Sequence, residues 1–419
     1  MRDVDSKGRQ VNAFQEYYHL KRDSFAIDPW ADADVYFGAG ALHERIRERI
    51  ETDFVQPRAV PKFFIYGPYG GGKTHTLAHI RQQLITHDAF AKDFPTEPVY
   101  LEIAPIRGNE RWVAVHERLL NSIGLTRLKQ AVSAVFMGAD PGQDPVSLLE
   151  ERNILRFGDD ALKASQAQIF RHLLFSGRPE MLSWEWLKGR QLKIDDAQIL
   201  GIQTNLSGTP TLVAALLNVG SLISAGLGRK VVFLVDEGEA LNNLTNADAI
   251  DDFAFAFRRL VDNENNVVGM VVAYESAGGM EKAPRLLQGD DIRRRVDYDL
   301  GYIDLTQLVA DPTEAREFIL QVLRHLIDQA EAAKTIKREG LDIEPEYFPF
   351  TAEAVDAIAD FVTEDPERAV PSQILSLMSA AVIAGWRKRS SSSKRIVVDS
   401  DLASFVMYPE DRVSDDSAV

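Results

Sequence analysis

One short stretch constrains this chain more than any other: an apolar run, a glycine-rich turn and a helical pattern in direct succession. The run Phe63–Tyr66 predicts a buried strand, and Thr74–Leu84 predicts a helix whose apolar residues recur on one face. The turn between them matches the phosphate-binding pattern G-x-x-x-x-G-K-[ST] in full. Its residues are Gly67, Pro68, Tyr69, Gly70, Gly71, Gly72, Lys73 and Thr74.

The chemistry of phosphate binding explains why these residue types stand at this spacing. Glycines let backbone N–H groups converge on phosphate oxygens, and the following helix directs its positive end at the same anion. Lys73 can reach the terminal phosphates of ATP, and the Thr74 hydroxyl can ligate Mg²⁺. A chance glycine turn is disfavoured because strand, glycines, Lys, Thr and helix are all in register. His75 is a candidate by position, but we interpret it as a local packing residue.

A second apolar run, Val231–Val235, ends in Asp236 and Glu237. Asp236 is the candidate to hold Mg²⁺ through its water shell, and Glu237 is the candidate general base that polarises the attacking water. Adjacent acids at the end of a buried strand are typical of ATPases rather than of simple kinases or GTPases. An acidic turn after a core strand is the alternative, and the phosphate-binding loop makes it less favoured. Glu239 is interpreted as a solvated or helix-capping residue.

Apolar strands alternate with helical patterns, which predicts an α/β fold with a parallel five-stranded sheet covered by helices. The remaining strands are predicted at Val99–Ile103, Val267–Ala273 and Tyr302–Leu305. After Pro312 the pattern is helical, at Glu314–Ala332, Ala352–Val362 and Gln373–Trp386. We divide the chain into an N-terminal segment (1–35), a nucleotide-binding domain (36–310) with a helical insertion (about 125–206), a helical lid (311–408) and a tail (409–419).

Composition narrows the class of protein further. Acidic residues outnumber basic ones, 63 to 47, so the formal charge of −16 disfavours a strongly basic DNA-binding protein. The chain contains no cysteine, which excludes disulfides and thiolate metal sites. The apolar stretch Thr211–Leu227 contains Asn218 and glycines, so we interpret it as a buried helix. We expect a cytoplasmic protein with no membrane partner.

The order of these motifs resembles an AAA+ ATPase, and more narrowly the clade of origin-recognition-complex-like initiator ATPases. Ala41–Arg45 resembles the family's helix that borders the adenine, and Val267–Ala273 resembles its sensor-1 strand. The resemblance implies that a polar residue after this strand contacts the terminal phosphate or the water. Glu275 and Ser276 are the candidates, and we favour Ser276 because the family usually has Asn, Thr or Ser there. The resemblance also implies an arginine finger in the cluster Arg293–Arg295, with Arg295 the first candidate and Arg294 the second; a solvated basic cluster is the alternative.

The resemblance leaves the sensor-2 arginine and the insertion open. Arg368 stands near the expected position, but Pro371-Ser372 aligns equally well and would place a serine there. The order of elements from Trp184 to Asp236 is similar to the P-loop ATPase of BREX-type phage-defence systems. We expect the insertion to bind a partner, although Trp184 and Trp186 can instead pack its own core.

These observations predict an ATP-hydrolysing switch that forms homo-oligomers and recruits or licenses an effector protein from the same operon. Its role would be defence against foreign DNA or maintenance of a mobile element. One alternative is a transposition-regulator or loader ATPase that assembles on DNA, so DNA stays open as a partner. The other is a nucleotide-binding scaffold with little turnover. The implied cofactors are ATP and Mg²⁺.

Overall fold

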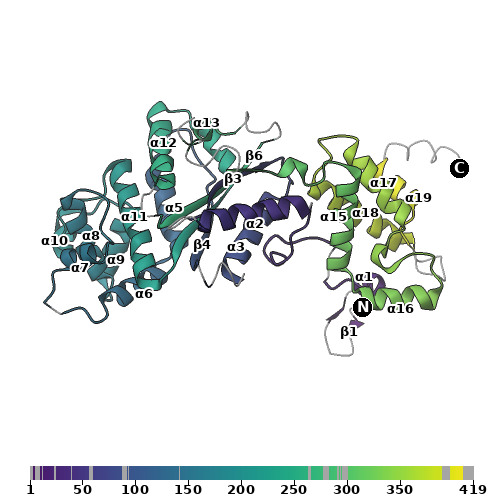
Figure 1. The fold of residues 1–419 in the computed structure, drawn as a ribbon, viewed down its shortest axis with the longest axis horizontal. Coiled ribbons are helices and arrows are strands. Elements are labelled where there is room, and N and C mark those ends of the chain that lie inside the picture. Colours follow the sequence, from purple (N-terminus) through teal and green to yellow (C-terminus); the bar gives the residue numbers. More distant parts are fainter. Residues whose placement is uncertain are drawn as a thin grey trace. The chain divides into compact units, whose positions relative to one another are not determined.

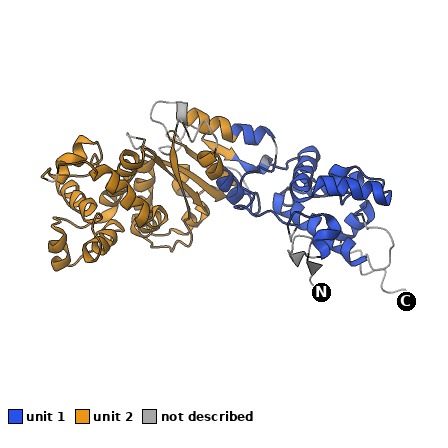
Figure 2. Cartoon of the chain, turned by 90° about the horizontal axis from the view of Figure 1, so that it is seen from below, with its two compact units in different colours: residues 1–45, 67–79, 304–419 blue, residues 46–66, 80–303 orange. Residues whose placement is uncertain are grey.

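A computed structural model describes residues 3–4, 10–11, 13–22, 25–38, 40–55, 60–86, 92, 94–140, 142–262, 266–276, 283–289, 292, 294, 301–388 and 397–408. By their internal contacts these residues form two compact units (Figure 2). One unit comprises residues 1–45, 67–79 and 304–419, and the other comprises 46–66 and 80–303. The predicted domain boundaries stay a prediction.

A five-stranded parallel sheet confirms the predicted α/β fold (Figure 1). Its strand order is β4-β5-β6-β3-β7. The strands are β3 (Lys62–Gly67), β4 (Thr96–Glu102), β5 (Lys230–Asp236), β6 (Val268–Glu275) and β7 (Tyr302–Asp304). All five predicted strands are present, and β4 begins three residues before the predicted start. Because the strands are parallel, their carboxyl ends lie along one edge of the sheet.

Three helices contact one another and cover β4, β5 and β6: α5 (Trp112–Ile123), α11 (Gly208–Leu227) and α12 (Ala247–Val261). Trp112 packs edge-to-face on Phe253 of α12, with ring centroids 5.4 Å apart. Helix α11 is long and apolar enough to cross a bilayer by length and composition, but most of its residues are buried inside the unit that comprises residues 46–66 and 80–303. The interpretation of this stretch as a core helix is therefore confirmed.

The predicted helical insertion consists of α6 (Leu125–Phe136), α7 (Pro145–Glu151), α8 (Asp160–His172), α9 (Arg178–Leu187) and α10 (Ile194–Leu200). A buried amide on α11 anchors it. The Asn218 side chain accepts the N–H groups of Arg156 and Phe157 and donates to Gln166 Oε1 at 2.8 Å. A buried amide is stable only when its hydrogen bonds are made, so this polar residue fixes how the insertion packs on the core helix.

The unit that comprises residues 1–45, 67–79 and 304–419 contains the C-terminal helices α15 (Pro312–Leu326), α16 (Gln329–Glu339), α17 (Ala352–Thr363), α18 (Pro371–Lys388) and α19 (Ser400–Met407). The prediction of a single helix over 314–332 was wrong, because α15 ends at Leu326 and a new helix begins at Gln329. Asp328 then caps α16 by accepting the N–H groups of Ala330 and Glu331. The remaining elements of the described chain are β1 (Asp3–Val4), β2 (Gln10–Val11), α1 (Ala13–Tyr18), α2 (Gly40–Val55), α3 (Lys73–Thr86), α13 (Arg285–Gln288), η1 (Gly238–Asn243), η3 (Leu305–Gln307) and η4 (Pro345–Tyr347).

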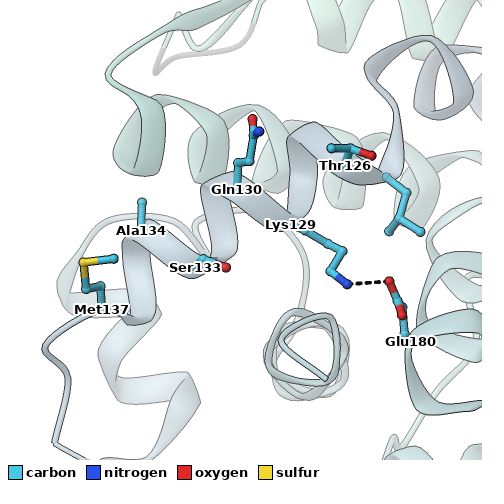
Figure 3. A pocket seen from close by; sticks show the side chains of 8 residues that line it. Thr126, Lys129, Gln130, Ser133, Ala134, Met137 and Glu180 are labelled. Carbon is cyan, nitrogen blue, oxygen red and sulfur yellow. Dashed lines mark hydrogen bonds and ion pairs between the residues drawn. The ribbon is translucent and has the colours of Figure 1, made fainter. Parts of the chain in front are cut away.

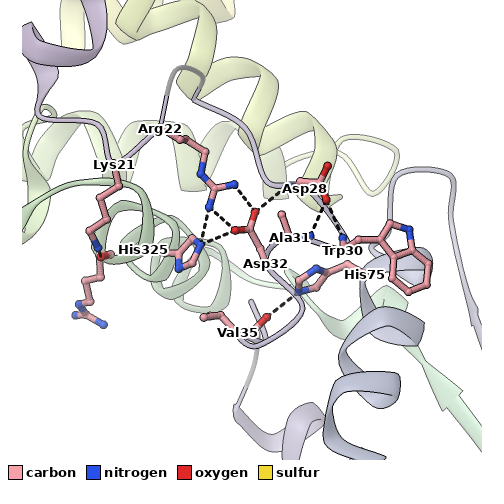
Figure 4. Close-up of polar contacts among 10 residues, drawn as sticks. Lys21, Arg22, Asp28, Trp30, Ala31, Asp32, Val35, His75 and His325 are labelled. Carbon is pink, nitrogen blue, oxygen red and sulfur yellow. Dashed lines mark hydrogen bonds and ion pairs between the residues drawn. The ribbon is translucent and has the colours of Figure 1, made fainter. Parts of the chain in front are cut away.

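A buried carboxylate ties the N-terminal segment to α15 (Figure 4). Asp32 is 1% exposed and receives hydrogen bonds from Arg22, at 2.7 Å to Oδ2, and from the Asp28 N–H, also at 2.7 Å. His325 Nε2 of α15 lies 2.8 Å from Asp32 Oδ1. Burial acts to raise the pKa of Asp32, but these partners outweigh it and lower the pKa to about 2. The charged form of Asp32 therefore stabilises the folded unit.

Asp32→Asn should lower the free energy of unfolding by about 3 kcal/mol at pH 7, because it leaves Arg22 without its buried counter-charge. Because its pKa is lowered on folding, the Asp32 carboxylate stabilises the folded chain fully at pH values above the ordinary aspartate pKa near 4. This stabilisation is lost as the pH falls towards 2. Urea unfolding at several pH values should therefore show the difference shrinking over that window. Asp356→Asn is the control, since the contact of Asp356 among the described residues is an exposed ion pair with Arg316. Equal losses in the two variants would contradict the prediction.

Candidate functional site

The glycine-rich turn adopts a backbone that other residues rarely reach. Strand β3 ends at Gly67 and α3 begins at Lys73. Between them, Gly70 has φ +73° and Gly72 has φ +86°, both in the left-handed region. The Lys73 ammonium donates hydrogen bonds to the carbonyl oxygens of Gly67, at 3.1 Å, and Pro68, at 2.8 Å. The lysine of this turn therefore lies over the loop, at the N-terminus of α3, where an anion is favoured.

A contact that the sequence did not reveal holds this loop against α18. The Ser372 N–H donates to the Gly70 carbonyl oxygen at 3.2 Å. A Cβ atom at position 70 would lie 1.9 Å from Ser372 Oγ, so only glycine fits beneath this serine. The two residues are separated by most of the chain, and their types alone carry no signal of the contact.

Arg368, the other candidate at the end of the lid, is held within its own turn. Its Nε lies 3.2 Å from Asp365 Oδ2, and its guanidinium lies 4.4 Å from the centre of the Phe361 ring. Of the two alternatives, Ser372 contacts the loop among the described residues. A nucleotide-binding role for Arg368 stays a prediction.

Two aromatic side chains near Lys73, Tyr69 in the loop and His75 on α3, differ in environment. Tyr69 is 82% exposed at the tip of the turn. His75 Nε2 lies 2.9 Å from the Val35 carbonyl oxygen, and its ring packs on Phe37. Burial lowers the pKa of His75, which favours the neutral ring. This environment agrees with the interpretation of His75 as a packing residue.

The acidic pair stands at the carboxyl end of β5, in the other unit. Asp236 is 4% exposed, and its two carboxylate oxygens accept the Glu237 N–H at 2.9 Å and the Tyr100 hydroxyl at 3.0 Å. Glu237 is exposed and has φ +57°, a left-handed backbone that costs a non-glycine residue energy. Burial raises the pKa of Glu237, and the charges of Glu102 and Asp236 raise it further. A carboxyl group with a raised pKa is a better proton acceptor once ionised.

Ser276 follows β6 directly and is 3% exposed. The Glu239 carboxylate accepts the Glu275 N–H at 2.8 Å, so it links the turn after the acidic pair to the end of β6. The interpretation of Glu239 as a solvated or capping residue therefore missed its main contact. Of the arginine cluster, Arg294 is described and exposed, whereas Arg293 and Arg295 lie outside the described residues.

The donors available for a metal suit magnesium. Among the described residues there is no group of three or more His, Cys, Asp or Glu side chains placed to hold a metal ion. Thr74 and Asp236 offer hydroxyl and carboxylate oxygens, the ligand types that Mg²⁺ prefers, and Mg²⁺ commonly retains waters and binds substrate phosphates. By ligand type, each of these residues suits magnesium rather than a softer transition metal.

The insertion carries no candidate for the chemistry but exposes several apolar side chains. Trp186 is buried and donates its Nε1–H to the Thr204 carbonyl oxygen at 3.0 Å, so it packs the insertion's own core. A shallow hollow of about 560 Å³ lies between α6 and α9, where Lys129 pairs with Glu180 at 2.6 Å (Figure 3). Met137 is one of the residues that line this hollow. The exposed apolar side chains of the insertion are Met137, Leu174, Phe175, Met181, Ile194 and Ile199.

Comparison with known proteins yields only distant similarity. No protein-family model matches the chain, and no curated protein matches its sequence. Among solved structures it is similar to the Aeropyrum pernix ORC1 protein in complex with DNA, with TM-score 0.42 and 13% identity over 96% of this chain and 72% of that one. It is also similar to the Aeropyrum pernix ORC2 protein in ADPNP–ADP complexes, with TM-score 0.42 and 12% identity over 90% and 71% of the two chains. At these values neither likeness carries a function to this chain, and the BREX resemblance stays a prediction.

Gly70→Ala should lower the free energy of unfolding by about 2 kcal/mol, because it adds left-handed strain and a clash with Ser372. Ser372→Gly should recover the clash component in the double variant, since it removes both the Oγ and the Cβ atom that crowd position 70. Gly72→Ala is the matched control, because it adds the same kind of strain where no atom lies within 4 Å. Urea unfolding of the single and double variants measures this. Rescue of Gly72→Ala by Ser372→Gly would argue against the contact.

Proposed function

We propose that this protein binds and hydrolyses ATP with magnesium, as an oligomeric switch of the AAA+ kind. The loop from Gly67 to Thr74 is the observation that carries the proposal. Two left-handed glycines, a lysine over the loop and a helix that starts at that lysine are the parts a triphosphate needs.

The acidic pair supports hydrolysis rather than binding alone. Strands β3 and β5 are parallel members of one sheet, so both end at the same edge. Strand β3 leads into the loop, and β5 ends at Asp236. In the proposed mechanism the loop and Lys73 bind the phosphates, Thr74 and Asp236 hold the magnesium, and Glu237 accepts the proton of the attacking water. Magnesium, when bound, neutralises charge on the terminal phosphates. Ser276 orients the water or the phosphate.

Glu237→Gln should bind ATP as the parent does but hydrolyse it at least about a hundredfold more slowly, because an amide cannot accept the water's proton. The base works only when it is ionised, and the pKa of Glu237 is raised. As the pH is lowered, the hydrolysis rate of the parent should therefore begin to fall at a pH above about 4.3, the ordinary pKa of glutamate. Phosphate release across a pH series measures both effects. Lys73→Ala is the contrasting variant, expected to lose binding of a fluorescent ATP analogue. Parental turnover in Glu237→Gln would place the base elsewhere.

We further propose that neighbouring subunits complete each site, with Arg295 or Arg294 reaching the ATP of the next chain. An arginine at this position would offset charge that develops on the transferring phosphoryl group. This part of the proposal rests on the sequence resemblance, and the exposure of Arg294 is compatible with it.

Mixing Lys73→Ala with Arg295→Ala chains should restore part of the activity that each lacks alone. The first chain supplies an arginine, and the second supplies an intact loop. Specific activity of the parent should also rise with protein concentration. These are measured as phosphate release over a dilution series, with each variant mixed with itself as the control. No rescue, together with activity independent of concentration, would indicate a monomeric ATPase or a finger donated by another protein.

For the biological role we propose an effector-recruiting switch in the cytoplasm, acting in defence against foreign DNA or in mobile-element maintenance. The exposed apolar side chains of the insertion, among them Met137 and Phe175, support a docking role for this region. ATP-dependent assembly on DNA would instead favour the loader alternative. A turnover assay and a footprint on DNA, both run with and without ATP, distinguish these roles from a scaffold with little turnover.

A further inference from the structure

Tyr100 lies beside the acidic pair, on the strand next to it. In the register between β4 and β5, Tyr100 pairs with Leu234, and Glu102 pairs with Asp236. Residues two apart on a strand share a face, so the phenol points along the same face that carries the Asp236 carboxylate. Its hydroxyl donates to Asp236 Oδ2 at 3.0 Å and lies 3.4 Å from Glu102 Oε1.

This hydroxyl is a neutral donor among negative charges. Asp236 is almost fully buried, Glu102 stands opposite it in register, and Glu237 follows it in the chain. A buried carboxylate needs hydrogen-bond donors, and carboxylates this close repel one another. Burial raises the pKa of Tyr100, and the charges of Asp236 and Glu102 raise it further, so the phenol keeps its proton.

The hydrogen bonds from the Glu237 N–H and the Tyr100 hydroxyl together fix the orientation of the Asp236 carboxylate. The Glu237 N–H binds Oδ1 and the Tyr100 hydroxyl binds Oδ2, so a rotation of the carboxylate breaks both. A carboxylate oxygen can in general accept more than one hydrogen bond, so a donor on each oxygen is compatible with a metal-bound water as a further partner. Donors that orient a group near a metal commonly set the metal affinity without touching the ion.

We propose that Tyr100 is a positioning residue that holds the Asp236 carboxylate in the orientation that serves magnesium. The proposal rests on the proposed ATP and magnesium site and adds a residue from β4 to it. Tyr100 acts through Asp236 and not on the nucleotide, so its loss should weaken the response to magnesium and leave metal-free nucleotide binding intact.

The test is the affinity of the full chain for a fluorescent, non-hydrolysable ATP analogue, titrated with magnesium from EDTA upwards. In Tyr100→Phe the half-saturating magnesium concentration should rise about tenfold, while the affinity in EDTA stays at the parent value. In the background of Asp236→Asn, adding Tyr100→Phe should cause no further loss, because the residue it positions is already changed.

Tyr347→Phe is the matched control, since its hydroxyl accepts a hydrogen bond from Arg316 and both residues belong to the other compact unit. It should leave the magnesium titration unchanged, and urea unfolding of each variant verifies that the chains are folded. A Tyr100→Phe titration that matches the parent, an equal loss of affinity in EDTA, or additive losses with Asp236→Asn would each overturn the role of Tyr100 alone. If the affinity of the parent chain for the ATP analogue does not change with magnesium concentration, the proposed function itself is overturned.

Discussion

Parallel pairing of β4, β5 and β6 is the constraint on which the rest of the molecule depends. It sets the ends of three buried strands side by side, and each end carries an acid: Glu102, Asp236 and Glu275. Buried strands can be uniformly apolar along their length, but their ends meet polar surroundings. Here three neighbouring strand ends each carry a carboxylate. The described contacts supply donors for this edge from Tyr100 and from backbone N–H groups. The chemistry we propose uses the charges that this pairing concentrates.

Local pattern was sufficient to predict the sheet, because each strand is a short apolar run and each turn after it carries glycine or acid. It also predicted the loop, since the glycines, lysine and helix follow one another directly in the chain. The contacts of Ser372 with Gly70 and of Tyr100 with Asp236 could not be predicted in this way. They join residues more than a hundred positions apart, and neither partner's type identifies the other. The break at Asp328 was missed because the apolar periodicity continues across it.

The polar residues inside the apolar core each fix one arrangement. Asn218 makes a set of hydrogen bonds that only one packing of the insertion on α11 can satisfy. Asp32 does the same for the N-terminal segment on α15. Apolar packing alone tolerates small shifts between helices, whereas a buried amide or carboxylate does not. A few buried polar residues, here Asn218 and Asp32, therefore contribute strongly to the geometry of each unit.

The left-handed backbone at Glu237 places stability and chemistry in opposition at one position. Glycine would relax this turn, and asparagine would tolerate it, but neither carries a carboxylate. Replacing Glu237 by glycine or asparagine should therefore give a more stable chain that lacks the proposed base. A search for thermostable variants that ignored turnover would select against the proposed base, and persistence of a glutamate there would itself record a demand for catalysis.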